Sequence, residues 1–401
     1  MLYLVILRSI RGANALPLSP LKDVQVMPKE LINYGSDAAD PGKSEWADRK
    51  RMLKDFKKET RVLKLLRHTK NPRIVKILGS YVYKGVYNLL FPLADMDLDD
   101  FLQGKPAPWA FRHTDEIVEE LRGLATALND VHSYRNEETE LELIGCHHDL
   151  KPSNILIFGG RLTLADFGLS RLIPPEQGSG TDFKDCLGDY FSPESLDESF
   201  SRQKIGRASD IWSFGCVIME VITFCEYGAK GVNQFRSIRR TEGRPRYMNS
   251  WFHSGGKMKI EVDHWLSKLQ GETQDESVSA LAALARNMLD ESADSRPRAD
   301  DVHVEIASIA LKSLAKRLAK QFEAFLGGHG DFGLDTEKKR FDEWCDGMDH
   351  DYHIARDQLP NRDLDSILFR DSPAHVGHVR ANSSHFTSRR NSCRKSKYRR
   401  P

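Results

Sequence analysis

The 401-residue chain has little net charge and few cysteines, and each shortage excludes a class of protein. Its 59 Lys and Arg residues nearly balance 58 Asp and Glu residues, so the formal net charge is +1 and no global field points to nucleic acid or membrane. The six cysteines are scattered without a C-x-x-C pair, which argues against a disulfide framework or a zinc site. We interpret them as reduced thiols of an intracellular protein, cytoplasmic or nuclear.

The chain begins with only a short apolar stretch, although hydrophobic residues make up 40% of its composition and are enough to bury a core. Met1–Leu7 is far shorter than the roughly 20 residues that a membrane-spanning helix needs. Arg8 and Arg11 follow it, whereas a signal peptide carries its basic residues in front. We therefore predict no transmembrane segment, and interpret Met1–Leu7 as a strand or as a misassigned start of the reading frame.

The most informative stretch is CHHDLKPSNIL, residues 146–156. It places Asp149, Lys151 and Asn154 on a short loop before an apolar run, the arrangement that phosphoryl transfer from ATP requires. The Asp149 carboxylate can accept the proton of a substrate hydroxyl. The Lys151 ammonium can neutralise charge on the moving phosphoryl group, and the Asn154 amide can hold a metal ion. The alternative is that this stretch, like the motif described next, is an ordinary solvated loop.

A second polar motif, Asp166-Phe167-Gly168, begins twelve residues after Asn154. The stretch RLTLA before it alternates apolar and polar residues, as a half-buried strand does. This spacing predicts a hairpin that carries the Asp166 carboxylate back to the metal site of Asn154. Either motif alone would be modest evidence, but their order and spacing together predict a magnesium–nucleotide site.

The two motifs resemble the catalytic loop and the D-F-G motif of the eukaryotic protein kinase superfamily. Three later stretches follow in the family's order: Ser192–Glu194 is similar to A-P-E, Asp210–Gly215 to the D-x-W-S-x-G helix start, and Asp294–Pro297 to the late arginine motif. The resemblance implies that Asp210 caps the catalytic loop and that Glu194 pairs with Arg296. The intact D-L-K-P-x-N looks like the serine/threonine group.

The resemblance also implies a lysine on the third strand and a glutamate on the next helix that pairs with it. Residues 45–67 show the pattern of an amphipathic helix, and Glu59 occupies the matching place; an ordinary solvated glutamate is the alternative. Lys22, in the partly alternating LKDVQV, is our candidate for the lysine, unless it is a surface residue. Lys29 is the runner-up, because the neighbouring Pro28 disfavours a central strand.

The end of a strand predicted at 85–93 resembles the connection between kinase lobes, where backbone groups hold adenine. Pro92 keeps a carbonyl that would accept from the adenine amino group, and Ala94 keeps an N–H that would donate to the ring. Asp97 lies where the family places an acidic residue near the ribose. For the other carboxylates of this stretch, a turn that caps the helix DLDDFLQ is an equal alternative.

Three departures from the family pattern matter. No G-x-G-x-x-G precedes these motifs, since Gly12, Gly35 and Gly42 are isolated. His148 stands where most kinases have an arginine that pairs with an activation-loop phosphate, so we expect that activity does not require loop phosphorylation. Leu187 stands where serine/threonine kinases usually carry a threonine that bridges the catalytic aspartate and lysine, which puts substrate positioning in question.

Hydrophobic periodicity predicts the other main elements. Strands are expected at 73–80 and 85–93, and a long helix at 114–133 with Thr114 as its N-cap. Residues 134–141 are expected to form a charged, exposed loop. Another long helix is predicted at 302–326, stopped by two glycines. Residues 327–401 are predicted to be a largely disordered basic tail that contacts anionic partners or only solvent.

We therefore predict an α+β, two-lobed protein kinase fold in residues 22–315. Its small β-rich N-lobe, complete or truncated, runs to about 93 and its mainly helical C-lobe follows, with residues 1–21 divergent and 316–326 ending the last helix. The predicted function is transfer of the ATP γ-phosphoryl group to Ser or Thr of a protein substrate, with ATP and Mg²⁺ as cofactors. The alternative is a catalytically weak or inactive kinase-like scaffold or binding module.

Overall fold

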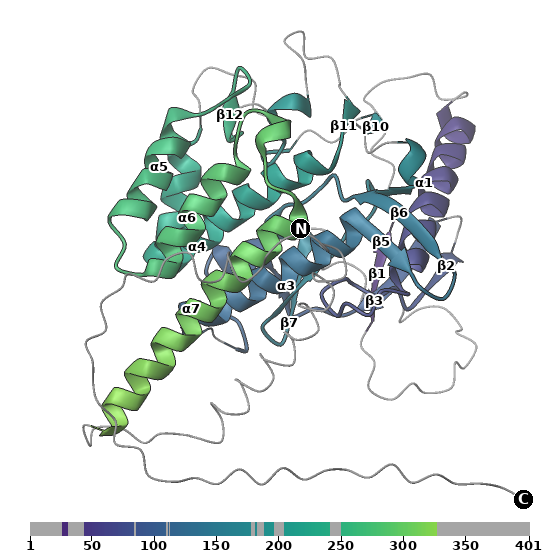
Figure 1. Cartoon of the computed structure of the whole chain (residues 1–401). Helices are drawn as coiled ribbons and strands as arrows, with labels where there is room; N and C mark the ends of the chain where they lie inside the picture. The colour runs from purple at the N-terminus through teal and green to yellow at the C-terminus, as the bar shows by residue number, and fades with distance from the viewer. Residues whose placement is uncertain are drawn as a thin grey trace, which may run out of the picture. The chain divides into compact units, whose positions relative to one another are not determined.

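The computed structural model describes residues 26–30, 44–83, 86–109, 111, 113–177, 181–182, 188–195, 204–240 and 250–326. Within these, a β-rich part comes first and helices dominate afterwards, as the predicted α+β fold requires (Figure 1). The helices are α1 (Ser44–Leu66), α2 (Leu98–Leu102), α3 (Thr114–His132), α4 (Arg207–Ile238), α5 (Ile260–Gly271), α6 (Glu276–Met288) and α7 (Ala299–Leu326).

The strands form small antiparallel sheets. The first sheet has the order β1 (Val26–Glu30), β3 (Val86–Pro92), β2 (Gly79–Tyr83). Two further sheets have the orders β4 (Met96–Asp97), β7 (Ile155–Phe158), β8 (Arg161–Leu164) and β5 (Ser133–Asn136), β6 (Leu141–Cys146), β9 (Arg171–Ile173). Two short pairs are β10 (Thr181–Asp182) with β11 (Lys204–Ile205), and β12 (His253–Ser254) with β13 (Lys257–Met258).

Helix α1 begins and ends within one residue of the helix predicted at 45–67. Val62, Leu63 and Leu66 supply its buried apolar stripe, at the three- and four-residue steps that place side chains on one helix face. Toward its middle, the ring of Phe56 lies 4.8 Å from that of Tyr87 on β3, centroid to centroid. The apolar face of α1 therefore packs on the first sheet and on the core.

The strand predicted at 73–80 was placed wrongly, because β2 begins only at Gly79. Residues 73–78 instead run beside β8: Ile74 forms a parallel bridge with Leu164, whose N–H donates to the Arg73 carbonyl at 2.7 Å. Ile74 and Val75 are buried in the core. The apolar residues that suggested a strand are thus satisfied by burial and by bonds to another sheet.

The exposed loop predicted at 134–141 is confirmed only for residues 137–140, which form an exposed turn, because residues 134–136 and 141 belong to the hairpin of β5 and β6. Tyr134 is buried, and its hydroxyl donates to the Leu65 carbonyl at the end of α1 (3.0 Å). The charged residues that suggested an exposed loop point outward, where Arg135 and Glu142 pair across the strands at 3.4 Å and are mostly exposed. Exposed residues alternate with buried ones in β5, as in a half-buried strand, and the many charged residues of the region made this alternation hard to recognise in the sequence.

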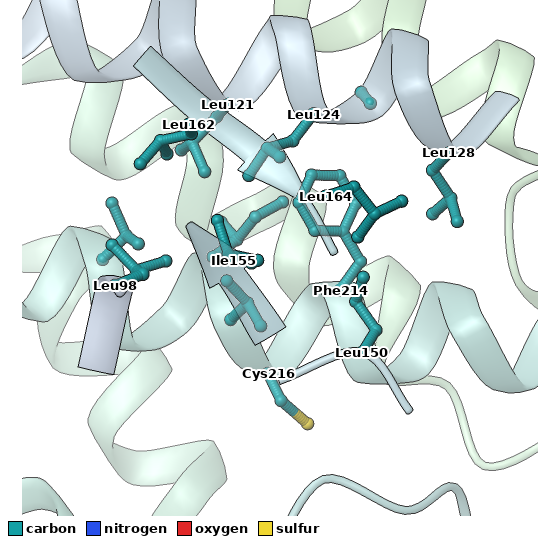
Figure 2. Packing of buried hydrophobic residues seen from close by; sticks show 14 of the residues in the cluster. Leu98, Leu121, Leu124, Leu128, Leu150, Ile155, Leu162, Leu164, Phe214 and Cys216 are labelled. Atoms are coloured by element: carbon teal, nitrogen blue, oxygen red, sulfur yellow. The ribbon is translucent and has the colours of Figure 1, made fainter. Parts of the chain in front are cut away.

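Helix α3 confirms the apolar stripe predicted for 114–133 and is flanked by α7 along its length (Figure 1). Its N-cap, however, is His113, which has an extended backbone and makes no side-chain cap hydrogen bond, so Thr114 is the first helical residue. Figure 2 shows leucines of α3 facing residues of β7 and β8, with α4 on the far side of these strands. The labelled residues of these elements are Leu121, Leu124, Leu128, Ile155, Leu162, Leu164, Phe214 and Cys216.

Helix α4 is long and apolar enough to cross a membrane by length and composition, but 83% of its apolar window is buried inside the fold. Its segment from Ser209 to Thr223 is continuously buried between α3, α6 and the activation segment, the stretch from the D-F-G motif to Glu194, whose Tyr190 is hydrogen-bonded to α4. The helix bends at Gly228, whose positive φ of 63° glycine adopts without strain. These contacts identify α4 as the central helix of the large lobe.

The predicted ion pair between Glu194 and Arg296 joins the activation segment to the stretch before α7. The Arg296 guanidinium donates to both carboxylate oxygens of Glu194, at 2.7 and 2.8 Å, and also to the Ala208 and Asp290 carbonyls. Burial would raise the pKa of Glu194, but the Arg296 guanidinium outweighs burial and lowers it. Since the Arg296 side chain is fully buried, its charge depends on these acceptors.

We expect Arg296→Gln to lower the free energy of unfolding by about 3–5 kcal/mol, because it leaves a partly buried carboxylate unpaired. The matched control is Arg298→Gln, since Arg298 is 70% exposed and its pair with Asp300 should contribute under about 1 kcal/mol. Urea denaturation measures both values. Equal losses in the two variants would show that the Glu194–Arg296 pair does not stabilise the fold.

Candidate active site

The predicted catalytic residues meet on the loop between β6 and β7. The Asp149 carboxylate accepts hydrogen bonds from the Lys151 ammonium at 3.0 and 2.9 Å. The Asn154 amide nitrogen donates to the Asp149 carbonyl at 2.7 Å and to its carboxylate at 2.8 Å. A 3₁₀ turn over Pro152–Asn154 creates this geometry, because it reverses the chain between Lys151 and the start of β7.

The exposure of these three side chains differs in a way that suits chemistry at the loop. Asn154 is buried, whereas the Asp149 side chain is 17% and the Lys151 side chain 34% exposed. A substrate hydroxyl can therefore approach the carboxylate and the ammonium. Both N–H bonds of the Asn154 amide are directed at Asp149, which leaves its oxygen as the atom for a cation.

Asp210, at the start of α4, fixes the backbone of this loop from the buried side. Its carboxylate accepts hydrogen bonds from the N–H groups of His147 and His148, both at 2.7 Å, and contacts the His132 ring nitrogen at 2.9 Å. Burial would raise the pKa of Asp210, but the His132 hydrogen bond and the nearby histidines lower it to about 2. The predicted cap of the catalytic loop is confirmed as a contact.

His147 connects the catalytic loop to the D-F-G motif, a role that sequence reasoning missed. Its Nε2 lies 2.9 Å from the Ala165 carbonyl, and its Nδ1 accepts the Asp149 N–H at 3.3 Å. Its ring also contacts that of the fully buried Phe167, with centroids 4.9 Å apart. These contacts fix a tautomer with the proton on Nε2. The sequence offered one indication of this role, namely a histidine two residues before Asp149.

The hairpin predicted to return Asp166 to Asn154 is present as β7 and β8. Ile155 pairs with Leu164, and the Ala165 N–H donates to the Asn154 carbonyl at 3.0 Å, so Asp166 follows directly. Asp166 itself has a positive φ of 61°, an uncommon conformation for a residue other than glycine. The backbone thus makes an abrupt turn at the residue predicted to bind a metal ion.

The donors present at this turn fit magnesium. Carboxylate and amide oxygens are the ligands Mg²⁺ prefers, and it commonly binds one or two carboxylates plus phosphate oxygens and water. Asp166 and Asn154 supply one donor of each kind from adjacent strands. In the part of the chain that the structure describes there is no cluster of three His, Cys, Asp or Glu side chains, so a cage made of protein ligands is absent there.

Glu59 lies beside the D-F-G motif, on the inner face of α1. Glu59 is only 2% exposed, and a side chain at Gly168 would place its Cβ atom 3.4 Å from a carboxylate oxygen of Glu59. Next to it, the Lys58 ammonium donates to the Leu169 carbonyl at 3.2 Å. The interpretation of Glu59 as a solvated helix glutamate is therefore wrong, and the absence of a side chain at Gly168 allows this approach.

The candidate Lys22 lies outside the described residues. The strand that pairs with β3 is Val26–Glu30, where the runner-up Lys29 stands opposite Leu89. Pro28 is tolerated because β1 is an outer strand among the strands that the structure describes, with β3 on one side. Lys29 thus lies on the strand next to β3, and our preference for Lys22 stays a prediction. Leu187 also lies outside the described residues.

The connection after β3 carries the residues predicted to hold adenine and ribose. Pro92 ends the strand, and the Asp95 N–H donates to the Ile157 carbonyl at 2.9 Å. Within the described residues the Ala94 N–H makes no such backbone bond. Asp97 is the N-cap of α2, since its carboxylate accepts the Asp100 N–H at 2.8 Å. Asp97 therefore caps α2, although it is the carboxylate for which we had preferred a role near the ribose.

Fold and site together define a protein kinase. Residues 43–305 match the protein kinase domain model, more than half of the chain. The chain therefore belongs to the protein kinase family.

Several curated serine/threonine kinases are similar to it. Cyclin-dependent kinase D-1 of Oryza sativa subsp. indica is 28% identical over 190 residues, which is 46% of this chain and 41% of that protein. Cyclin-dependent kinase 7 of Dictyostelium discoideum is 29% identical over 193 residues, 47% of this chain and 49% of that protein. Serine/threonine-protein kinase MPS1 of Encephalitozoon cuniculi is 40% identical over 77 residues, 19% and 13% respectively. Each match thus spans less than half of the relative's length.

The structure predicts a pH dependence at His148. The pKa of His148 is lowered to about 4, mainly by burial and also by the charges of His147, Lys58 and Arg171, against the opposing effect of Asp210. Since the ordinary pKa of a histidine side chain is 6.5, the unfolded chain binds a proton between pH 6.5 and 4 that the folded chain does not. Stability should therefore fall as pH falls through this window.

We expect His148→Gln to reduce that loss of stability, because glutamine does not titrate. The measurement is the free energy of unfolding in urea at several pH values between 7 and 4. The exposed His264→Gln variant is the control, and it should follow the unmodified protein. An unchanged slope in His148→Gln would mean that this side chain takes up a proton in the folded protein as readily as in the unfolded one.

Proposed function

We propose that the protein transfers the γ-phosphoryl group of ATP to serine or threonine hydroxyls of protein substrates. The observation that carries the proposal is the hydrogen-bonded set of Asp149, Lys151 and Asn154. Asp166 follows Ala165, whose N–H is bonded to the Asn154 carbonyl. A structural loop has no need for an ammonium and an amide that converge on one accessible carboxylate.

In the proposed reaction Asp149 orients the substrate hydroxyl and accepts its proton. The hydroxyl oxygen bonds to the γ-phosphorus while the bond between that phosphorus and the β–γ bridging oxygen breaks, so ADP leaves with the electron pair. The Lys151 ammonium, held beside Asp149, neutralises charge on the transferred group. Asn154 and Asp166 would hold Mg²⁺, which when bound neutralises charge on the phosphates.

The nucleotide would lie between α1 and the connection after β3. We propose that a lysine ahead of α1, Lys22 or the runner-up Lys29, pairs with Glu59 and contacts the phosphates. The Pro92 carbonyl and the Ala94 N–H would hold adenine through its edge. Asp97 retains one carboxylate oxygen for the ribose, since its other oxygen caps α2.

A second function is supported by one observation in the sequence. No G-x-G-x-x-G lies before the catalytic motifs, where the kinase family places the segment whose backbone covers the phosphates. A scaffold that binds partners or nucleotide without turnover would tolerate this. The two functions differ in one measurable property, because only the enzyme depends on Asp149 as a base.

The protein substrate and the cellular location are proposed on simpler grounds. In the described part of the chain Cys146, Cys216 and Cys225 form no disulfide bond, which favours a reducing compartment, cytoplasmic or nuclear. The last residues, SRRNSCRKSKYRRP, are strongly basic, so the tail would contact anionic partners.

The first test of this function is nucleotide binding. We expect ATP with Mg²⁺ at millimolar concentration to raise the thermal midpoint of the unmodified protein. Asp166→Asn should remove this shift, because the metal ion loses its carboxylate ligand. Asp294→Asn, an exposed carboxylate in a later motif, is the control that should keep it. If the unmodified protein shows no shift, the scaffold function replaces the enzymatic one.

The second test separates catalysis from binding. We expect Asp149→Asn to reduce phosphorylation of a generic basic protein by about 10²–10⁴-fold, the usual contribution of a general base. Nucleotide binding should change little, since Asp149 contacts the hydroxyl and not the nucleotide. Single-turnover phosphotransfer and the thermal shift with ATP measure the two effects. Equal loss of both would assign Asp149 a structural role.

A further inference from the structure

A groove of about 1180 Å³ lies on the large lobe, away from the residues of the proposed active site. Four half-buried aromatic side chains form a cluster in it, with ring centroids 4.7–5.6 Å apart: Phe101, Trp109, Phe111 and Phe224. They come from α2, from the connection to α3 and from α4. An apolar hollow of this size with partly exposed rings is typical of a docking surface.

Lysines of α7 also line the groove. Lys312, Lys316 and Lys320 are exposed and follow one another at four-residue steps, so they share one helix face. Lys316 pairs with Glu276 at 2.6 Å. Among the described residues, Lys312 and Lys320 form no ion pair, which leaves two cationic side chains available to an anionic ligand.

The acidic residues that line the groove are already engaged. Asp115 pairs with Arg317 at 3.0 Å, Glu276 pairs with Lys316, and Asp275 caps α6 through the Ser277 N–H at 2.9 Å. Their charges are therefore compensated within the fold. The groove thus combines an aromatic cluster with a net cationic lining, and the complementary ligand carries aromatic rings next to carboxylates.

The chain itself contains such a ligand shortly after α7. Residues 341–344 read Phe-Asp-Glu-Trp, two aromatic residues that flank two carboxylates. We propose that Phe341–Trp344 docks in this groove of the same molecule, with its rings against the aromatic cluster and its carboxylates on Lys312 and Lys320. The proposal is independent of phosphoryl transfer.

The geometry of the chain allows this return. Helix α7 lines the groove and ends at Leu326, and Lys316 lies ten residues back, about 15 Å along the helix axis. Residues 327–340 form a link of 14 residues, which can extend to about 46 Å. Its first two residues are glycines, so the reversal after α7 is not restricted by side chains.

The test is a short thiol cross-link in the full-length chain. Cys345 follows Trp344 directly, and Ser313 lines the groove on α7. In a background with Cys186→Ser, Cys225→Ser and Cys393→Ser, which removes the native thiol that lines the groove, we expect Ser313→Cys to give an intramolecular link to Cys345 with a short bis-maleimide. The matched control is Lys64→Cys, exposed on α1, which should give at least fivefold less link. Mass spectrometry of tryptic peptides measures the yields.

Three further variants distinguish docking from random contact by the tail. Trp344→Ala should lower the yield at least fivefold by removing one ring, and Lys312→Glu with Lys320→Glu should do so by reversing the charge. Adding Asp342→Lys and Glu343→Lys to the latter should restore the yield, since the charges are then exchanged. The thermal midpoint of each variant confirms that the fold is intact.

Two results would overturn the proposal. One is a yield without specificity: the yield is equal at positions 313 and 64, or it does not change in the Trp344→Ala variant. The other is a link formed between two molecules, seen as a doubled mass at low micromolar protein, because the occupant would then belong to a second copy. A supporting result requires the position preference, the loss in the two variants and the recovery after charge exchange.

Discussion

The buried carboxylate of Asp210 is the interaction on which the site depends. It accepts two consecutive backbone N–H groups of the catalytic loop and contacts the His132 ring. A carboxylate without access to water is costly unless such donors surround it, and once they do, neither the loop nor the carboxylate can move alone. His148 adopts its positive φ of 66° within this arrangement, so the bonds to Asp210 offset a backbone conformation that is otherwise unfavourable.

The catalytic loop also fixes the conformation of the D-F-G motif through direct contacts. His147 bonds to the Ala165 carbonyl and contacts Phe167, while the Asn154 carbonyl accepts the Ala165 N–H. The conformation of Asp166 is therefore coupled to that of Asp149 through short, buried contacts. Glu59 reaches this unit from α1, a helix whose end is also bonded to the buried Tyr134. A shift of α1 would thus be felt beside Gly168 and on the β5–β6 hairpin.

Local spacing carried most of what the sequence could predict about the site. Asp149, Lys151 and Asn154 are close in sequence, so a single turn brings them together, and the hairpin to Asp166 follows from alternation over a few residues. The errors occurred where distant partners decide. Arg73–Leu78 is apolar like a strand, but its backbone pairs with β8. Tyr134 looked like part of a charged loop, and only the packing of a distant helix end explains its burial. Thr114 was predicted as the N-cap from its side chain alone. The N-cap is His113, because its backbone is extended, and the sequence does not show this.

The absence of a glycine loop bears on the nucleotide and leaves the catalytic geometry untouched. Every described contact that positions Asp149 comes from β6 onward, from α3 or from α4, none from residues before α1. The catalytic loop is therefore supported entirely by the large lobe and its immediate hairpins. What a glycine loop adds is cover over the phosphates, which affects nucleotide affinity and the exclusion of water. The described contacts therefore support our proposal of a phosphotransfer that depends on Asp149, and the missing cover over the phosphates predicts that this activity is weak.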